Sequence, residues 1–363
     1  MNKLINKLIL APAGGRKTQT IVDNCLLGDT SANRLIVTFT TTGQKVIQER
    51  VWKNKSNIGK LEISGWYAFL LNHIIYPYVY DKYPKQTVKG FHFVEGKNPS
   101  RYRKGSKRYF DDEGKVYSSN IGKLAHDVAV ASNGAWIDRL ERIYDEIYFD
   151  EVQDLAGNDL DILKMLFQSN ITIICVGDVR QTIYSTNRTD TKYKNYRGLQ
   201  KILWYKEMES LGLCEIEERT KTWRCNQDVI DFADSVLPKE LEFPATKSMN
   251  INKTEHDGIF LISWDNLTTY INTFKPTCYR NRVDSLILEG TIATNFGQCK
   301  GETVPRVLIY PTKPIKSFLK DSTNQLKNQS ASSFYVAITR AIHSVAIVVE
   351  KPNQYNIQEW VPR

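Results

Sequence analysis

Three acidic residues follow an apolar run near the middle of this 363-residue chain. Residues 147–154 read IYFDEVQD, so Asp150 and Glu151 come directly after the apolar run, and Asp154 is the last residue of the segment. An apolar run of this kind is typical of a buried strand in a parallel sheet. Open α/β sheets bind ligands at the carboxyl ends of their strands. One carboxylate there can hold a hydrated magnesium ion while its neighbour polarises a water, which is half of a site for a nucleoside triphosphate.

The other half is predicted near the N-terminus. A strand at residues 8–10 is followed by the loop APAGGRKT and by a helix expected over residues 19–27. In such a loop, backbone N–H groups and a helix N-terminus face an anion, a lysine reaches the phosphates and a threonine hydroxyl binds magnesium. Arg16 replaces the usual glycine before the lysine, and its β-carbon is expected to strain the loop. Taken alone, the loop could be a chance match. With the acidic strand it predicts a phosphate site at Ala13, Gly14, Gly15, Arg16, Lys17 and Thr18.

The remaining pattern predicts an α/β protein with two similar halves. In the first half, strands at 34–41 and 171–176 end in polar clusters, one with Phe39 and Thr40 and the other with Gln181 and Tyr184. Helices are expected at residues 43–52 and 159–167. In the last third, strands are expected at 258–263, 285–288, 307–310 and 345–349, with helices at 227–237 and 333–341 and a mobile polar loop at 312–332. We therefore predict one domain from residues 1–60 and 145–215, and a second from 216–363.

Residues 61–144 are predicted to form a small, mainly helical insertion in the first domain. An aromatic helix is expected from residue 63 to 75, and another helical stretch from 125 to 144. Between them lies a hairpin dense in charge, in which cations alternate with aromatic side chains. This mixture suits single-stranded nucleic acid, because phosphate contacts and base stacking can be combined. A solvated hairpin fits equally well. The interleaved residues are Lys97, Arg101, Tyr102, Arg103, Lys104, Lys107, Arg108, Tyr109 and Phe110.

Composition favours a soluble cytoplasmic protein with a polyanionic partner. Lys and Arg exceed Asp and Glu by nine, and the sequence pI is about 9.0. A basic surplus favours nucleic acid over a membrane, although it also fits a merely basic enzyme. The six cysteines are far apart in the sequence, so a disulfide framework or a metal cluster is not expected. No apolar run approaches the roughly 20 residues of a membrane span.

The order of these clusters resembles that of superfamily 1 helicases of the UvrD/Rep type. The resemblance rests on residues 150–154 (DEVQD), 176–178 (VGD) with the nearby Gln181, and 335–341 (YVAITRA). Residues 38–40 (TFT) resemble the family's first DNA-contacting motif. Trp223-Arg224 resembles its YRS element, and Lys300-Gly301 resembles the start of its KGLE element.

This resemblance implies two RecA-like P-loop NTPase domains with parallel sheets, which bind ATP and Mg²⁺ in the cleft between them. Glu151 would be the base for the attacking water, and Gln181 would sense the γ-phosphate. Arg224 and Arg340 would be arginine fingers, although each could instead form a surface ion pair. The remaining assignments are Thr18 and Asp150 for the metal, Gly301 for the nucleotide, and Phe39, Thr40 and Tyr184 for the nucleic-acid track. The insertion adds Arg101, Arg103 and Lys104 to that track, while Tyr184 could instead pack between domains.

The chain departs from the family in size. Only about 60 residues separate Trp223-Arg224 from the strand expected at 285–288, too few for the large second insertion of UvrD-type helicases. The resemblance therefore implies an ATP-driven 3′–5′ translocase or helicase on single-stranded DNA, with RNA as a further possible partner. Compact relatives occur beside nucleases in bacterial anti-phage systems, so a partner nuclease or other subunit and a role in antiviral defence or repair are expected. The rivals are a nucleic-acid-gated ATPase switch that does not translocate, and a P-loop phosphotransferase.

Overall fold

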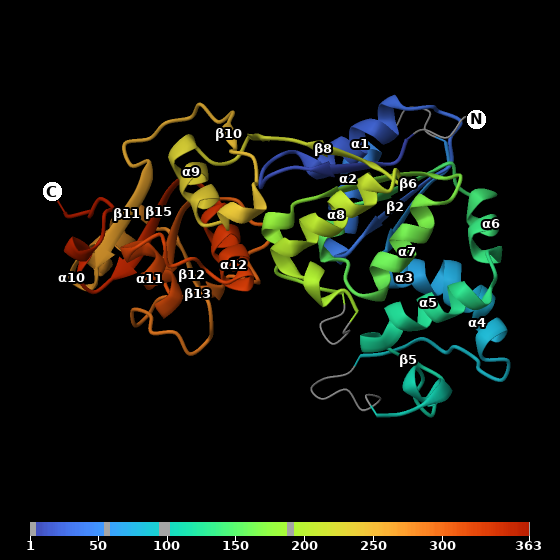
Figure 1. Cartoon of the computed structure of the whole chain (residues 1–363). Helices are drawn as coiled ribbons and strands as arrows, with labels where there is room; N and C mark the ends of the chain where they lie inside the picture. The colour runs from blue at the N-terminus through green and yellow to red at the C-terminus, as the bar shows by residue number, and fades with distance from the viewer. Residues whose placement is uncertain (1–4, 54–58, 94–101, 187–191, 363) are drawn as a thin grey trace.

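Two parallel sheets, each covered by helices, form the two halves of the protein. The computed structural model describes residues 5–53, 59–93, 102–186 and 192–362. Figure 1 shows the first half in blue to yellow-green and the second in yellow to red. The expected mixed α/β architecture with RecA-like parallel sheets is confirmed. No helix among the described residues is long and apolar enough to cross a membrane.

The first sheet has six parallel strands in the order β3-β2-β6-β7-β1-β8. Successive side chains of a strand point to opposite faces, and here both faces are apolar because helices cover both. Ile9, Ile36 and Tyr148 pack with α1 and α2 on one face, whereas Leu35 and Phe149 belong to the larger core on the other. The strands are β1 (Lys7–Leu10), β2 (Arg34–Thr38), β3 (Leu61–Gly65), β6 (Glu146–Phe149), β7 (Thr172–Gly177) and β8 (Glu215–Glu218). The helices are α1 (Lys17–Leu27), α2 (Thr41–Lys53), α7 (Asn158–Phe167) and α8 (Lys201–Ser210).

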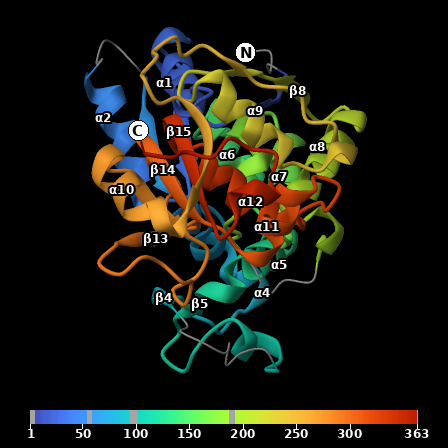
Figure 2. The ribbon, with the colours of Figure 1, turned by 90° about the vertical axis from the view of Figure 1, so that its left-hand side faces the viewer.

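The insertion is mainly helical, as expected, and projects below the first sheet in Figures 1 and 2. It begins with a continuous helical run formed by α3 (Trp66–Leu70), a π-helical turn (Leu71–Ile75) and α4 (Tyr76–Lys82). Two short strands, β4 (Phe91–His92) and β5 (Val116–Tyr117), pair in parallel. The helices α5 (Ile121–Ala131) and α6 (Ala135–Glu141) return the chain to the acidic strand β6.

The second sheet has five parallel strands in the order β11-β15-β14-β12-β13. Its strands are β11 (Gly258–Ser263), β12 (Thr277–Arg280), β13 (Ala293–Asn295), β14 (Val304–Tyr310) and β15 (Ala341–Val349). Its helices are α9 (Gln227–Ser235), α10 (Trp264–Phe274), α11 (Lys313–Lys320) and α12 (Asn328–Ile338). The short strands β9 (Lys221–Thr222) and β10 (Lys247–Ser248) pair beside it.

Several elements differ from the sequence predictions. Residues 61–65, predicted as part of the insertion, form the edge strand β3 of the first sheet, so the aromatic helix starts only at Trp66. Helix 125–144 is two helices, because the chain turns at residues 132–134, where Asn133 and Gly134 both have positive φ. The apolar run at 285–288 lies in a loop of the described chain and not in a strand. The stretch 312–332 holds α11 and the start of α12 instead of a mobile loop. The domain boundaries beyond these elements remain predictions.

Candidate functional site

The loop after β1 ends directly in helix α1. Lys17 is the first residue of the helix, so the unpaired N–H groups of its first turn face the same cleft as the loop. The Lys17 ammonium donates to the carbonyls of Ala11 (3.2 Å) and Pro12 (3.1 Å), and lies 3.9 Å from Asp178. Burial lowers the pKa of Lys17, and the neighbouring carboxylates of Asp178 and Glu151 oppose that effect. The loop therefore presents a desolvated cation beside the N–H groups at the start of α1, as a phosphate site requires.

Arg16 adopts the left-handed backbone conformation that its position demands, with φ 57° and ψ 32°. This conformation costs a residue with a β-carbon about 1–2 kcal/mol, so the expected strain is present. The exposed guanidinium of Arg16 lies over the indole ring of Trp223, with Cζ 4.2 Å from the ring centroid. A cation–π contact at an exposed site contributes about 0.5–1 kcal/mol, which offsets only part of the backbone cost.

Asp150 lies at the carboxyl end of β6 and meets the first residues of α1. The Thr18 hydroxyl donates to its carboxylate at 3.1 Å. Burial and the neighbouring charge of Glu151 raise the pKa of Asp150 above its ordinary value. A hydroxyl beside a carboxylate is a pair of hard oxygen ligands, the kind that Mg²⁺ prefers. The structure therefore brings together the two residues predicted to hold the metal.

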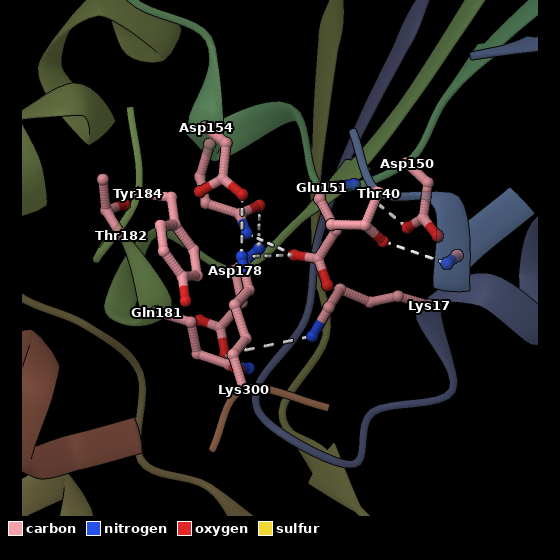
Figure 3. Close-up of polar contacts among 12 residues, drawn as sticks. Lys17, Thr40, Asp150, Glu151, Asp154, Asp178, Gln181, Thr182, Tyr184 and Lys300 are labelled. Atoms are coloured by element: carbon pink, nitrogen blue, oxygen red, sulfur yellow. Dashed lines mark hydrogen bonds and ion pairs between the residues drawn. The ribbon is translucent and has the colours of Figure 1, made fainter. Parts of the chain in front are cut away.

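Glu151 is in contact with the second domain. Its carboxylate accepts from the Gln153 side-chain amide and lies 3.4 Å from the Lys300 ammonium. Lys300 also contacts Asp154 at 2.8 Å, and these groups face one another in Figure 3. Burial pushes the pKa of Glu151 upward, but Lys300 and Lys17 outweigh burial and hold it well below the ordinary value. For Asp154 burial prevails and raises the pKa to about 6.

A hydrogen-bonded chain joins the two domains through Gln181. Its amide nitrogen donates to Asp178 at 2.7 Å, and its amide oxygen accepts from Arg340 at 3.1 Å. Arg340 follows α12 and is only 1% exposed, with further hydrogen bonds to the carbonyls of Val336 and Glu302. Because Arg340 is buried, it cannot form the surface ion pair that was its alternative assignment.

Arg224 approaches the cleft from the same side as Arg340. Its guanidinium donates to the Thr339 carbonyl at 3.1 Å and lines the cleft. Burial and the positive charge of Arg340 lower the pKa of Arg224 to about 10. Two desolvated arginines on one wall of the cleft attract an anion strongly. Gly301, with φ 97°, also lines the cleft, whereas the Glu302 carboxylate accepts a 2.6 Å hydrogen bond from the Tyr279 hydroxyl.

The cleft of about 1300 Å³ continues from the phosphate loop past Phe39, Thr40 and Tyr184 to the insertion. Tyr184 is 40% exposed, and its hydroxyl donates to the Gly297 carbonyl of the second domain at 2.5 Å. Tyr184 therefore makes the inter-domain contact that was its alternative role, while its ring still lines the cleft. Phe39 and Thr40 lie at the carboxyl end of β2, on the same wall.

Three further aromatic side chains line the far end of the cleft and were missed by the sequence analysis. Tyr67, Phe91 and Phe93 form a row with ring centroids 5.8 and 5.6 Å apart, and Phe93 is 70% exposed. The sequence FHF at residues 91–93, with aromatic residues at alternate positions, could have indicated Phe91 and Phe93. Lys300 and Asp154 were also absent from the predicted site, although both belong to motifs that carry the resemblance.

The basic hairpin is only partly as predicted. Tyr109 and Phe110 are 4% and 3% exposed, so they pack in the core and cannot stack on bases. Arg103 and Lys104 are exposed, and Arg103 donates to the Tyr117 hydroxyl at 3.1 Å. Arg101 lies outside the described residues. The hairpin thus offers cations and an exposed ring, that of Tyr102, which is 87% exposed. A second set of rings, those of Tyr67, Phe91 and Phe93, lines the cleft.

Comparison with known proteins supports the resemblance predicted from the motifs. Residues 99–199, less than a third of the chain, match the family model of the UvrD/REP helicase N-terminal domain. A structure of arterivirus nonstructural protein 10 (helicase) in complex with DNA matches with a TM-score of 0.50 at 12% identity, over 96% of this chain and 62% of that one. A crystal structure of the same arterivirus helicase matches with a TM-score of 0.49 at 12% identity, over 97% of this chain and 62% of that one. At this identity the likeness concerns the fold. No curated protein matches the chain significantly.

Proposed function

We propose that this protein hydrolyses ATP in the cleft between its two RecA-like domains and that single-stranded nucleic acid stimulates the reaction. The observation that carries the proposal is the convergence of both domains on one cleft. Lys17 and Asp150 line it from the first domain, and Arg224 and Arg340 line it from the second. A site that needs groups from two domains can couple hydrolysis to their relative movement.

The residues present fit ATP and Mg²⁺. The loop at residues 13–18 would hold the phosphates through its backbone donors and Lys17, and Gly301 lines the same cleft. Thr18 and Asp150 would hold the metal, as their 3.1 Å contact supports. When bound, Mg²⁺ neutralises charge on the β- and γ-phosphates.

In the proposed reaction, Glu151 takes a proton from the water that attacks the γ-phosphorus, and the bond to the ADP oxygen breaks. Gln181 orients the attacking water or the γ-phosphate. Arg224 and Arg340 stabilise the charge that spreads over the transferring phosphoryl group. Glu151 can act as the base only when Lys300 no longer neutralises it, so movement of Lys300 would precede hydrolysis.

Nucleic acid would bind along the far part of the cleft. Phe39, Thr40 and Tyr184 lie between the nucleotide loop and the aromatic row, so a strand there would be close to Lys300, whose ammonium is 5.8 Å from the Tyr184 ring centroid. Exposed Arg103 and Lys104 would attract the phosphate backbone. By resemblance, alternating grip would move the protein 3′ to 5′ along DNA, and a nuclease partner in antiviral defence or repair fits the compact size.

A second candidate, a gated ATPase switch without translocation, is favoured by the ion pair between Lys300 and Glu151. This contact neutralises the proposed base, which is how a switch stays off. ATP hydrolysis with and without single-stranded DNA or RNA, measured beside displacement of a 3′-tailed duplex, separates the two. The motor requires stimulated hydrolysis with displacement, and the switch requires stimulation alone. Hydrolysis unaffected by either nucleic acid contradicts both.

A further inference from the structure

The phosphate loop is hydrogen-bonded directly to the segment that carries Arg224 of the second domain. The Thr222 hydroxyl donates to the Ala13 carbonyl at 2.6 Å, and the Trp223 amide donates to the Gly14 carbonyl at 3.1 Å. A β-carbon on Gly14 would lie 2.6 Å from the β-carbon of Arg224, so only glycine permits this approach. The loop and residues 222–224 therefore form one packed unit.

Arg16 adds a side-chain contact to this unit. Its backbone occupies the left-handed region, where glycine would be unstrained, yet its guanidinium covers the indole of Trp223. The stack offsets only part of the backbone cost, so stability alone does not account for an arginine at this position. The contact with Trp223 explains the arginine at this position, because glycine has no side chain that could reach the indole ring.

We propose that Arg16 is a positioning residue that latches the phosphate loop to Trp223 and thereby fixes Arg224 in the cleft. Arg224 is the next residue along the chain, and its guanidinium lines the cleft beside the loop. An arginine that stabilises a transition state acts only when held in the right geometry, and misplacement by about 1 Å can cost about a hundredfold in rate. This role in turnover rests on the proposed hydrolysis, whereas the latch itself does not.

Hydrogen exchange tests the latch without ATP. In Arg16→Gly, the peptide covering residues 220–226 should exchange faster than in the wild type. Without the stack on Trp223, the hydrogen bond from the Trp223 amide to the Gly14 carbonyl should open more often. Arg16→Lys, which keeps the cation, should show intermediate protection. The β15 peptide at residues 341–349 serves as the internal reference and should not change. Equal exchange of residues 220–226 in the wild type and Arg16→Gly would overturn the latch, whether or not the protein hydrolyses ATP.

A double-mutant cycle on turnover tests the positioning role. Arg16→Gly and Trp223→Leu should each lower kcat about threefold. Arg16→Gly should do so without lowering the temperature of thermal unfolding, because glycine relieves the left-handed backbone strain at this position. The double variant should fall no further than either single variant, because both changes remove the same contact. Trp223→Phe keeps an aromatic face and should retain most of the wild-type kcat. A double variant reduced by the product of the two single effects, about ninefold, would show that Arg16 and Trp223 act independently and would overturn the proposal.

Discussion

Lys300 of the second domain forms a 3.4 Å ion pair with Glu151, the proposed base of the first domain. Lys300 is mostly buried, and it also contacts Asp154 at 2.8 Å. A carboxylate neutralised in this way is a weak base, because the cation stabilises its deprotonated form. The relationship makes the position of Lys300 a control point for the proposed reaction.

Replacing Lys300 with methionine should raise hydrolysis in the absence of nucleic acid and reduce the factor of stimulation. Lys300 lowers the pKa of Glu151, so its removal raises that pKa. Glu151 must be deprotonated to accept a proton, so the acidic limb of the pH–rate profile should move to higher pH. Steady-state rates from about pH 5 to pH 9 measure both effects. Lys300→Arg, which keeps the charge, should behave like the wild type, and an unmoved acidic limb in Lys300→Met would contradict the assignment.

Removal of the Arg340 guanidinium should slow turnover by roughly a thousandfold or more, as expected for an arginine finger. Arg340 also donates to Gln181 across the domains, so Arg340→Lys should rescue little, because lysine lacks the planar fork of donors. Single-turnover hydrolysis measures the chemical step. Arg282→Ala, at an exposed surface ion pair, is the matched control and should be unaffected. A wild-type kcat in Arg340→Ala would make this residue purely structural.

Phe93 should contribute stacking to single-strand binding. Stacking of a base on an aromatic side chain is worth about 1–3 kcal/mol, so Phe93→Ala should weaken binding of oligo(dT) about tenfold or more. The salt dependence of binding should stay the same, because Phe93 neutralises no phosphate. Tyr80→Ala removes another exposed aromatic side chain of the insertion outside the cleft, and should bind normally. Equal affinity of Phe93→Ala and the wild type would exclude Phe93 from the track.

Lys104 and Lys107 should instead contribute to the salt dependence of single-strand binding. Both are exposed, and for each phosphate that is no longer neutralised the slope of log K against log salt should decrease by about 0.7. Fluorescence anisotropy of labelled oligo(dT), titrated at several concentrations from about 50 to about 300 mM NaCl, measures the slope. Replacing Lys239 and Lys253 of the second domain with alanine controls for net charge. An unaltered slope in the Lys104→Ala/Lys107→Ala variant would return the hairpin to its alternative assignment as a solvated surface.

The sequence predicted the parts of the site that depend on strand ends. Asp150 and Gln181 follow apolar runs, and the carboxyl ends of parallel strands meet at one edge, so their convergence followed from local pattern. The contacts of Arg16 with Trp223 and of Lys300 with Glu151 could not be predicted, because each depends on how two domains pack.

The incorrect predictions about the fold also arose where tertiary packing overrides local pattern. The apolar residues at 285–288 have a strand-like composition, yet Leu286 is 78% exposed because no neighbouring strand of the described chain pairs with this segment. Tyr109 and Phe110 are interleaved with cations, but tertiary packing draws them into the core. In the polar stretch 312–332, a few apolar residues at helical spacing sufficed to anchor α11, since Ile315, Phe318 and Leu319 are buried.

The most direct test of the inter-domain ATPase is the Glu151→Gln variant, compared with the wild type in the presence and absence of single-stranded DNA. Glutamine keeps the size of the side chain and one acceptor oxygen, but it carries no charge and cannot accept the proton of the attacking water. Binding of ATP, measured with a fluorescent analogue, should stay within about twofold of the wild type, whereas DNA-stimulated phosphate release should disappear. DNA-stimulated hydrolysis at the wild-type rate in Glu151→Gln would contradict the account.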